Sequence, residues 1–361
     1  MGPAPQTLGI ETSCDETAVA VLDCEGRVEF DVLSSQVASH APFGGVVPEL
    51  ASREHLKALP WLVDKALENG TQEIELVAVT AGPGLVGALL VGVRFASAFA
   101  WARDLPMVAV DHLDGHQASP FLRRERRPAK QVPPRVLALV ASGGHSAWYL
   151  SEHGVSTRLR RTRDDAAGES FDKVGKVLGL PYPGGPVIDR LARRGCAERG
   201  LFRQPKIKDG SNDLSFSCLK SAAIREARQR GLEGVGEAAA GPEMVNLLAS
   251  FESAVIRQLL GPMKELVHEH RPDLVTISGG VAANSALRRA ITDEADRLGV
   301  ALLIPEPCFT TDNAAMIARA GQLGWLAGRR DDPRRLDART REIWHPPVMR
   351  RKLDQQARGA E

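Results

Sequence analysis

Two histidines four residues apart are the first residues in this sequence that could do chemistry. They stand in His112-Leu113-Asp114-Gly115-His116, an HxxxH pattern. On a helix, residues four apart share one face, so both imidazoles could bind one metal ion. If the motif stood alone, two histidines that only pack or titrate would explain it better. The HExxH site of zinc proteases is excluded, because Leu113 occupies the position of its catalytic glutamate.

Four further polar residues lie in turns or at the start of predicted helices. Asp312 precedes a clear helical pattern in CFTTDNAAMIARAG, and Asn284 opens another helix. Each of them could simply be an N-cap. Asp15 and Glu16 are adjacent, so a strand would send them to opposite faces, whereas a turn could direct both into a cleft. Local turn chemistry alone explains such an acidic pair equally well.

Three glycine-rich turns could hold a phosphate. They are Ser142-Gly143-Gly144, Tyr182-Pro183-Gly184-Gly185-Pro186 and Ser278-Gly279-Gly280. At such turns backbone N–H groups can approach an anion, helped by the N-terminus of a following helix. No Walker loop occurs, and a structural turn is the default interpretation of any one of them. Three turns beside paired hairpins favour a nucleotide held between two lobes.

The elements that must position these residues occur twice along the chain. Leu8–Asp23 and Val136–Ser151 are each two β-rich runs around a tight turn, the pattern of a hairpin. Leu76–Gly92 and Leu274–Ala290 are each a buried strand, a glycine turn and a helix. Strands this apolar that alternate with helices predict sheets covered on both faces. The repeat predicts two related α/β lobes; two unrelated hairpins in one α/β protein are the alternative.

Three other segments have a distinct pattern. Arg123–Arg135 is basic and proline-rich, which predicts a loop or linker. Glu49–Asn69 carries apolar residues at helical spacing, which predicts an amphipathic helix kinked by Pro60. After about Arg350 the chain is polar, and we expect it to fray.

Composition places the chain among ordinary globular proteins. Its 361 residues allow two domains of about 150 residues each, and 43% of them are hydrophobic. With 46 basic against 45 acidic residues, any nucleic-acid site must be a local patch. Five scattered cysteines without a CxxC pair fit a reducing compartment. With no signal-like N-terminus and no apolar run of about 18 residues, we expect a cytoplasmic protein.

Nine ordered blocks together resemble the universal tRNA threonylcarbamoyl transferase family, long called O-sialoglycoprotein endopeptidase. The resemblance extends from Gly9 to about Trp344 and is stronger to the bacterial branch than to the archaeal or eukaryotic cytosolic one. The blocks are GIETSCDET (Gly9–Thr17), SQVASHAPFGGVVPELASREH (Ser35–His55), TAGPGLVGALLVG (Thr80–Gly92), HLDGH (His112–His116), SGGH (Ser142–His145), DDAAGESFDK (Asp164–Lys173), YPGGP (Tyr182–Pro186), SGGVAAN (Ser278–Asn284) and TDNAAMIA (Thr311–Ala318).

The resemblance implies a duplicated two-lobe, actin-like α/β fold, the ASKHA fold, with the active site in the cleft between the lobes. We accordingly divide the chain into an N-terminal lobe (7–120 and 307–345), a C-terminal lobe (135–306), a basic linker (121–134) and a polar tail (350–361). The implied reaction moves a threonylcarbamoyl group from threonylcarbamoyl-AMP to N6 of adenosine 37, in tRNAs that read codons beginning with A.

The resemblance also assigns roles to individual residues. His112, His116 and Asp312 match the family's metal ligands. The positions that match its adenylate-binding residues are Val140, Ala141, Ser142, Gly143, Gly144, Asp172, Gly185, Asp189 and Asn284. Asp15 and Glu16 match acidic residues of the first motif. Either could accept the proton of the attacking amine, and the sequence does not decide between them.

The resemblance implies one divalent metal ion as cofactor, with iron(II) favoured over zinc(II), although these ligands accept both. It implies two protein partners, an inactive paralogue of the TsaB type and a small P-loop ATPase of the TsaE type. We expect the helix Glu49–Asn69 and its neighbours to form the paralogue interface, because their apolar residues exceed what one buried face needs.

Binding of tRNA, the implied acceptor, requires local basic clusters. Two candidates are Arg123, Arg124, Arg126, Arg127 and Lys130 in the linker, and Arg334, Arg335, Arg339 and Arg341 near the C-terminus. A solvated basic surface is the equally good alternative for each cluster.

Three positions depart from the family pattern, and none of them is a ligand. Asp111 stands where many members have another histidine, Ala314 replaces the glycine of TDNG, and Cys218 replaces the glycine of FSGLK. The cysteine puts the backbone of that turn in question, because glycine tolerates angles that cysteine does not.

Two other functions fit the sequence less well than the transferase. A metalloprotease lacks HExxH here and leaves the nucleotide turns unexplained. A non-catalytic nucleotide-binding scaffold has no need of His112, His116 and Asp312 together. The sequence therefore predicts the transferase.

Overall fold

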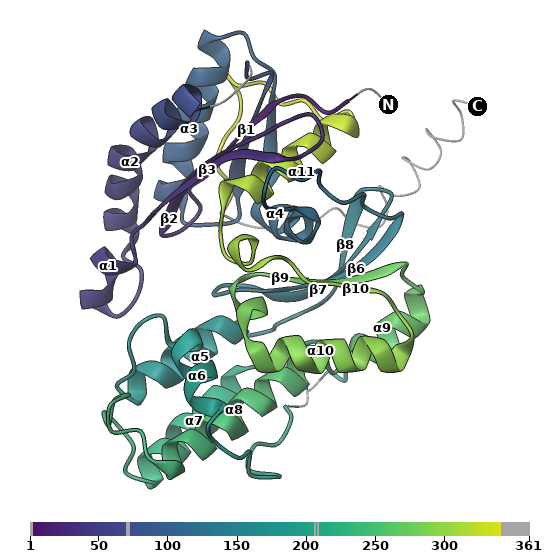
Figure 1. Cartoon of the computed structure of the whole chain (residues 1–361). Helices are drawn as coiled ribbons and strands as arrows, with labels where there is room; N and C mark the ends of the chain where they lie inside the picture. Colours follow the sequence, from purple (N-terminus) through teal and green to yellow (C-terminus); the bar gives the residue numbers. More distant parts are fainter. Residues whose placement is uncertain (1–2, 70–72, 206, 208, 341–361) are drawn as a thin grey trace.

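The protein consists of two lobes, each built on a five-stranded sheet (Figure 1). The computed structural model describes residues 3–69, 73–205, 207 and 209–340. None of the described helices is long and apolar enough to cross a membrane.

The two sheets have the same topology. The strands of the N-terminal lobe are β1 (Thr7–Glu11), β2 (Glu16–Leu22), β3 (Val28–Ser35), β4 (Leu76–Gly82) and β5 (Met107–Asp111), in the order β3-β2-β1-β4-β5. Those of the C-terminal lobe are β6 (Arg135–Ala141), β7 (Ser146–Glu152), β8 (Val155–Arg161), β9 (Leu274–Ser278) and β10 (Leu302–Leu303), in the order β8-β7-β6-β9-β10. In both sheets the three hairpin strands pair antiparallel and the later two add in parallel. The predicted duplication is confirmed.

The N-terminal sheet is covered on both faces, as strands this apolar require. The covering helices are α2 (Pro48–Asn69) and α3 (Val86–Ala102) on one face, and α4 (His112–Ala118) and α11 (Ala314–Leu326) on the other. Alternate residues of β2 serve the two faces: Val19 packs with α2 and α3, while Ala20 packs with α11. A Cβ at Gly9 would lie 2.4 Å from the Ala314 carbonyl oxygen, so glycine permits the close approach of α11 to β1.

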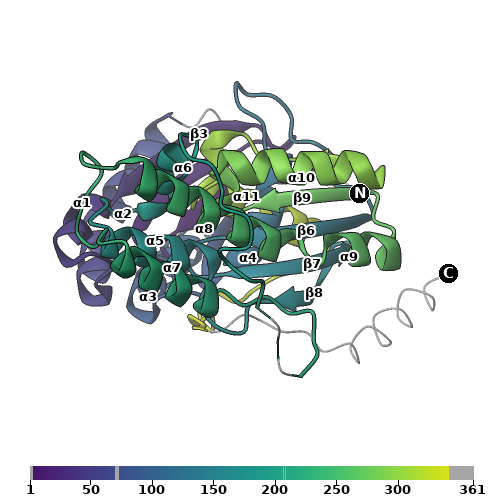
Figure 2. The ribbon, with the colours of Figure 1, turned by 90° about the horizontal axis from the view of Figure 1, so that it is seen from below.

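The C-terminal sheet uses its two faces differently. One face packs on helices of its own lobe, which Figure 2 shows from below: α5 (Ala167–Val177), α6 (Gly184–Ala192), α7 (Ser217–Gln229), α8 (Pro242–Leu260), α9 (Met263–His270) and α10 (Ser285–Leu298). On the other face, Ala138 and Val140 of β6 pack against Leu113 of α4. Helix α4, which carries the HxxxH motif, therefore joins the two lobes.

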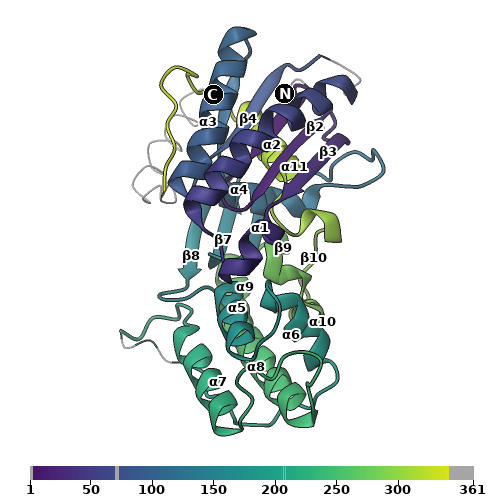
Figure 3. The ribbon, with the colours of Figure 1, turned by 90° about the vertical axis from the view of Figure 1, so that its left-hand side faces the viewer.

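The short elements lie in the connections. They are α1 (Val37–His40), η1 (Ala41–Phe43), η2 (Ser119–Phe121), η3 (Gly280–Ala283) and η4 (Pro307–Phe309). Figure 3 shows α1 at the end of the N-terminal lobe that faces α5.

Helix α2, the linker and the first turn of α7 correspond to three segments singled out in the sequence. The amphipathic helix is α2, and it continues through Pro60, whose ring lies on the exposed face. The segment after η2 has no regular structure until β6 begins at Arg135, as predicted for a linker. The concern about Cys218 was wrong: it lies in the first turn of α7 with no left-handed angle, so glycine is not needed. Two predictions lie outside the described residues: the polar tail after Arg350, and Arg341 of the C-terminal basic cluster.

Candidate active site where the lobes meet

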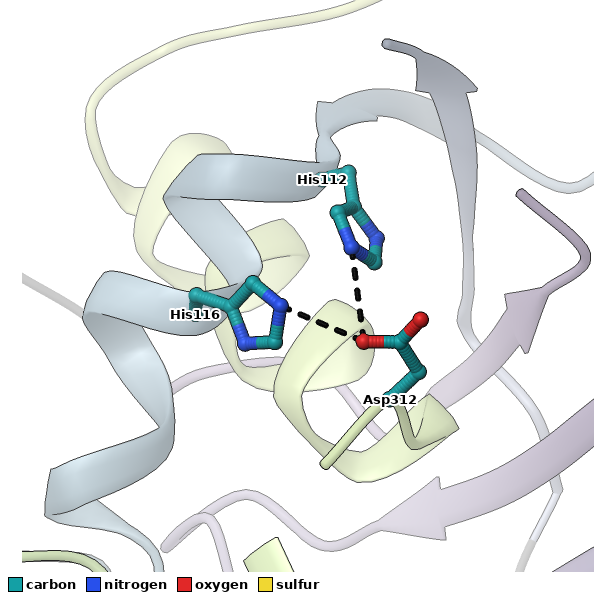
Figure 4. Close-up of side chains that lie close together, drawn as sticks. All are labelled: His112, His116 and Asp312. Carbon is teal, nitrogen blue, oxygen red and sulfur yellow. Dashed lines mark ion pairs between the residues drawn. The ribbon is translucent and has the colours of Figure 1, made fainter. Parts of the chain in front are cut away.

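The HxxxH motif and Asp312 lie together, although almost two hundred residues of sequence separate them (Figure 4). The Asp111 carboxylate accepts the Leu113 N–H at 2.9 Å and starts α4, so His112 and His116 share one helix face. Asp312 Oδ1 lies 3.5 Å from His112 Nε2 and 3.2 Å from His116 Nε2. The three ligand atoms all lie within 4.8 Å of one another, which suits a single metal ion.

Local structural roles do not explain this triad. The N-cap interpretation of Asp312 is wrong: Asn313 caps α11, because its side chain accepts the Met316 N–H at 2.9 Å. His116 is fully buried, yet apart from the 3.2 Å approach of Nε2 to Asp312 its ring nitrogens have no polar partner in the part of the chain that the structure describes. Buried polar atoms are nearly always paired, and a metal ion would satisfy one of these nitrogens. The residues therefore fit a metal ion.

A buried glutamate that sequence analysis missed stands behind the triad. Glu11 Oε2 accepts hydrogen bonds from His112 Nδ1 at 3.1 Å and from Thr80 Oγ1 at 2.6 Å. Glu11 Oε1 accepts the Ser13 N–H at 2.5 Å. A carboxylate that holds the far nitrogen of a histidine fixes the ring and directs Nε2 to the ligand. The available signal was a glutamate ending an otherwise apolar strand.

The charges of the site favour a cation. Burial lowers the pKa of His116, which keeps its imidazole neutral, as a metal ligand must be. Burial opposes a charge on His112 too, but the carboxylates of Asp312 and Glu11 outweigh it and raise the pKa of His112 well above its usual range. Burial likewise opposes the ionisation of Asp312, yet the two imidazoles hold its pKa well below normal. Asp312 faces the two Nε2 atoms and Glu11 faces His112 Nδ1, so both carboxylates favour positive charge here; a metal ion bound at Nε2 would replace the proton on His112.

The first glycine turn lies beside the triad. Gly143 and Gly144 are exposed, whereas Val140 and Ala141 are buried in β6 and can offer a ligand only their backbone. Burial, then the charges of His112 and His116, lower the pKa of the next residue, His145, to about 4. Val140 and Ala147, which flank the turn, pack with Leu113 of the HxxxH helix. The turn that contains Ser142 therefore adjoins the candidate metal site.

The first and third turns abut. Gly279 has a φ of +88°, and a Cβ there would lie 2.3 Å from the Ala141 carbonyl oxygen. The Ser142 carbonyl in turn accepts the Gly168 N–H at 3.2 Å, which ties the first turn to the start of α5. The structure thus brings the 142–144 and 278–280 turns together, as a phosphate-binding pair requires.

The second turn begins α6 and is held by Asp172. The Asp172 carboxylate accepts the Gly184 N–H at 2.8 Å, while burial raises its pKa. A Cβ at Gly185 would have no neighbour closer than 3.9 Å, so the backbone there is open to a ligand.

Asp189 and Asn284 form a neighbouring cluster. Asp189 Oδ1 accepts the Ser285 hydroxyl at 2.6 Å. Asn284 caps α10 through the Leu287 N–H at 2.8 Å, which confirms its N-cap interpretation. Its amide nitrogen also donates to Glu252 at 2.6 Å. Sequence analysis missed Glu252, a carboxyl whose pKa burial raises to about 7.

The acidic pair faces the second turn from the other lobe. Asp15 lies in the turn after β1, and Glu16 is the first residue of β2. Burial and then the charge of Asp15 raise the pKa of Tyr182, and Asp15 also contributes to the raised pKa of Asp172. Asp15 therefore lies close enough to both residues for its charge to act on them.

Glu16 is prepared to take a proton. Its Oε1 accepts the Ser35 hydroxyl at 2.9 Å, whereas its buried Oε2 has no hydrogen-bond partner among the described residues. Burial raises the pKa of Glu16 to about 7. A carboxylate with a pKa near neutrality is effective as a general base.

Comparison with known proteins identifies the family. A family model described as tRNA N6-adenosine threonylcarbamoyltransferase matches residues 27–319. The chain belongs to this family. It is 46% identical over 331 residues to the protein of that name from Geobacter sulfurreducens, covering 89% of this chain and 94% of the relative. It is also 46% identical over 334 residues to the Geobacillus thermodenitrificans protein of the same name, covering 90% and 93%.

Solved structures support the fold of this transferase family member. HypF from T. kodakarensis superposes with a TM-score of 0.58 at 14% identity, over 91% of this chain and 49% of HypF. A likeness at this identity shows the fold alone. Together with the duplicated sheets, it confirms the actin-like two-lobe fold.

The family match covers most of the site but not all of it. Residues 27–319 include the triad and the three glycine turns. The acidic turn and Glu11 precede that range, so their roles depend on the geometry given above.

Proposed function

We propose that this protein transfers the threonylcarbamoyl group from threonylcarbamoyl-AMP to N6 of adenosine 37, in tRNAs that read codons beginning with A. The observation that carries this proposal is the triad of His112, His116 and Asp312 beside paired glycine turns, within the range that matches the family. A protease would leave the paired glycine turns unexplained, and a nucleotide-binding scaffold would leave the triad unexplained. AMP release from the donor that depends on added tRNA tests the proposal, and tRNA-independent turnover would count against it.

The triad would hold one divalent ion; two imidazoles with one carboxylate accept iron(II) and zinc(II), and the family resemblance favours iron(II). When bound, such an ion supplies Lewis acidity for the donor's phosphate and carbonyl oxygens. Around it, Glu11 fixes the ring of His112, and the burial of His116 keeps that imidazole neutral.

The adenylate would occupy the turns. The backbone at Gly143, Gly144 and Gly185 suits the close approach of a phosphate, because a Cβ at each of these positions would have no neighbour closer than 3.9 Å. Asp189 can accept a hydrogen bond from a nucleoside hydroxyl, and Asn284 can donate one to a nucleoside oxygen or ring nitrogen. The Asn284 oxygen is used by the α10 cap and one amide hydrogen by Glu252, so one N–H remains for the ligand.

The reaction needs positioning more than activation of the leaving group. The adenosine N6 attacks the carbamoyl carbon, the bond from that carbon to the phosphate oxygen breaks, and AMP leaves. The attacking nitrogen loses one proton, and we assign it to Glu16 rather than Asp15, because Glu16 Oε2 is unpartnered among the described residues and its pKa is about 7. An unpaired base in the anticodon loop can be splayed into such a site.

We propose the exposed face of α2 and α3 as the surface for the inactive paralogue. A groove of about 470 Å³ lies between the helices, lined by Leu56, Leu59, Pro60, Leu90, Val91, Arg94 and Phe95. Leu56 and Trp61 of α2 are 62% and 57% exposed. Apolar side chains exposed in this way do not stabilise a monomer, but they are typical of a protein–protein interface. Changing Trp61 to glutamate should abolish association with the paralogue in gel filtration and reduce turnover in the reconstituted system. Full activity of strictly monomeric protein would contradict this interface.

The P-loop ATPase is proposed as the second partner from the family resemblance alone.

Binding of tRNA through the linker is a separate proposal. The structure determines which of the linker arginines are suitable for mutation. Arg123 pairs with Glu306 at 3.5 Å and the Arg124 backbone donates to the same carboxylate, so these two residues anchor the linker. Changing the exposed Arg126 and Arg127 to glutamate should weaken tRNA binding and lower its salt slope by about one unit for each phosphate that is no longer neutralised. Donor binding should not change. An unaltered slope in a filter-binding titration would move the tRNA site elsewhere.

A further inference from the structure

A chain of buried polar side chains lies beneath the acidic turn and has no role in the proposed reaction. Thr17, His40 and His55 are completely buried, and Gln36 is 4% exposed. They come from β2, the start and end of α1, and α2. Burying four polar side chains is costly unless every polar atom is used, so their arrangement is informative.

The partners fix the direction of every hydrogen bond in the chain. The Val47 N–H donates to His40 Nδ1 at 3.2 Å, so His40 Nε2 carries the proton and donates to Gln36 Oε1 at 3.1 Å. The Gln36 amide nitrogen then donates to His55 Nδ1 at 3.3 Å, and the Thr17 hydroxyl donates to the same nitrogen at 2.7 Å. Both imidazoles are thereby used as neutral rings.

The chain ends on the backbone of the acidic turn. With Nδ1 accepting, His55 Nε2 must donate, and it does so to the Cys14 carbonyl at 3.0 Å. Burial lowers the pKa of His55, in agreement with a neutral ring. The Gln36 backbone N–H donates to the next carbonyl, that of Asp15, at 3.0 Å. Two successive carbonyls of the turn are therefore held by one network.

The same segment also reaches the other lobe. A Cβ at Gly44, just after η1, would lie 2.9 Å from Lys176 Nζ of α5, so the backbone of the segment passes close to that lysine. Figure 3 shows α1 facing α5. The network thus connects a segment that touches the C-terminal lobe to the turn that presents Asp15 and Glu16.

We infer that His55, oriented by Gln36, is a positioning residue that holds the acidic turn in the geometry needed for transfer. This inference depends on the proposed function. It differs from a purely structural role, because it requires the hydrogen bond from His55 Nε2 to Cys14 and not merely a filled space. The side-chain nitrogen of glutamine can take the place of Nε2, whereas leucine fills a similar volume without a donor.

The test compares His55→Gln with His55→Leu in the full chain, loaded with metal and assayed with its partners. Because small misplacements of reacting groups are costly, His55→Leu should lower kcat on the order of 10²-fold, while KM for threonylcarbamoyl-AMP stays within about twofold. His55→Gln should recover kcat to within about tenfold of wild type. Metal content should equal that of the wild type in both.

Two further variants separate positioning from stability. Leu62→Ala empties a buried site on the same face of α2 and should lower the melting temperature while kcat stays unchanged. Gln36→Leu should lower kcat even where His55→Leu fails to fold, because it removes one of the two donors to His55 Nδ1, the other being Thr17, and also the side-chain link to His40. The inference is overturned if His55→Leu keeps wild-type kcat, or if His55→Gln and His55→Leu lower kcat to the same extent. Inactive wild-type protein would instead overturn the proposed function together with this inference.

Discussion

Changing His116 to alanine should remove the bound metal and lower transfer by about 10³-fold, which corresponds to the several kcal/mol that an ion supplies to such a transition state. The fold should survive. His116 lies on a short helix whose N-cap, Asp111, is unaffected, and among the described residues its ring nitrogens pair only with Asp312, another residue of the triad. Metal content by mass spectrometry, far-UV circular dichroism and initial rates of transfer are the three measurements.

His268→Ala is the matched control, because His268 is an exposed histidine on α9. It should keep both its metal and its activity. If His116→Ala retained as much metal as the wild type, the assignment of His112, His116 and Asp312 as ligands would be wrong.

Changing Glu16 to glutamine should lower kcat by about 10²- to 10⁴-fold, the usual contribution of a general base. The pH profile gives the sharper result. Burial raises the pKa of Glu16 to about 7, and only the ionised form can accept a proton. In the wild type, kcat/KM for tRNA should therefore fall as pH decreases through about 7 and level off above it. Glu16→Gln should lose this dependence.

The variant Asp15→Asn shows which of the two acidic residues, Asp15 or Glu16, is the general base. It should keep the dependence on a group that titrates near pH 7, with a change in its midpoint at most, because the charge of Asp15 contributes to the raised pKa of Glu16. If Asp15→Asn lost this dependence and Glu16→Gln kept it, Asp15 would be the base.

The sequence predicted those parts of the fold that have a local pattern. The hairpins at residues 8–23 and 136–151 are the antiparallel pairs β1–β2 and β6–β7, because each has two apolar runs around a short turn. The repeated strand–glycine–helix units supply β4 and β9, which explains why the two sheets share one order. The HxxxH spacing predicted a shared helix face, which α4 provides.

Residues whose partners are distant in sequence could not be predicted in this way. Glu11 meets Thr80 and His112, which are 69 and 101 residues further along the chain. Glu252 meets Asn284 only because α8 and α10 are neighbours. Asp312 was the candidate cap of α11, but the next residue, Asn313, caps the helix, because only its side chain reaches the Met316 N–H. At Cys218 an expected turn was the start of a helix, where cysteine causes no strain.

The central claim is tested most directly by the product itself. The purified protein, loaded with iron(II) and combined with its partners, is incubated with threonylcarbamoyl-AMP and an unmodified tRNA that reads codons beginning with A. A matched tRNA with guanosine at position 37 is the control, and the digested nucleosides are analysed by mass spectrometry. We expect threonylcarbamoyladenosine at position 37 of the first tRNA and none in the control. Unmodified adenosine after complete consumption of the donor would contradict the proposed function.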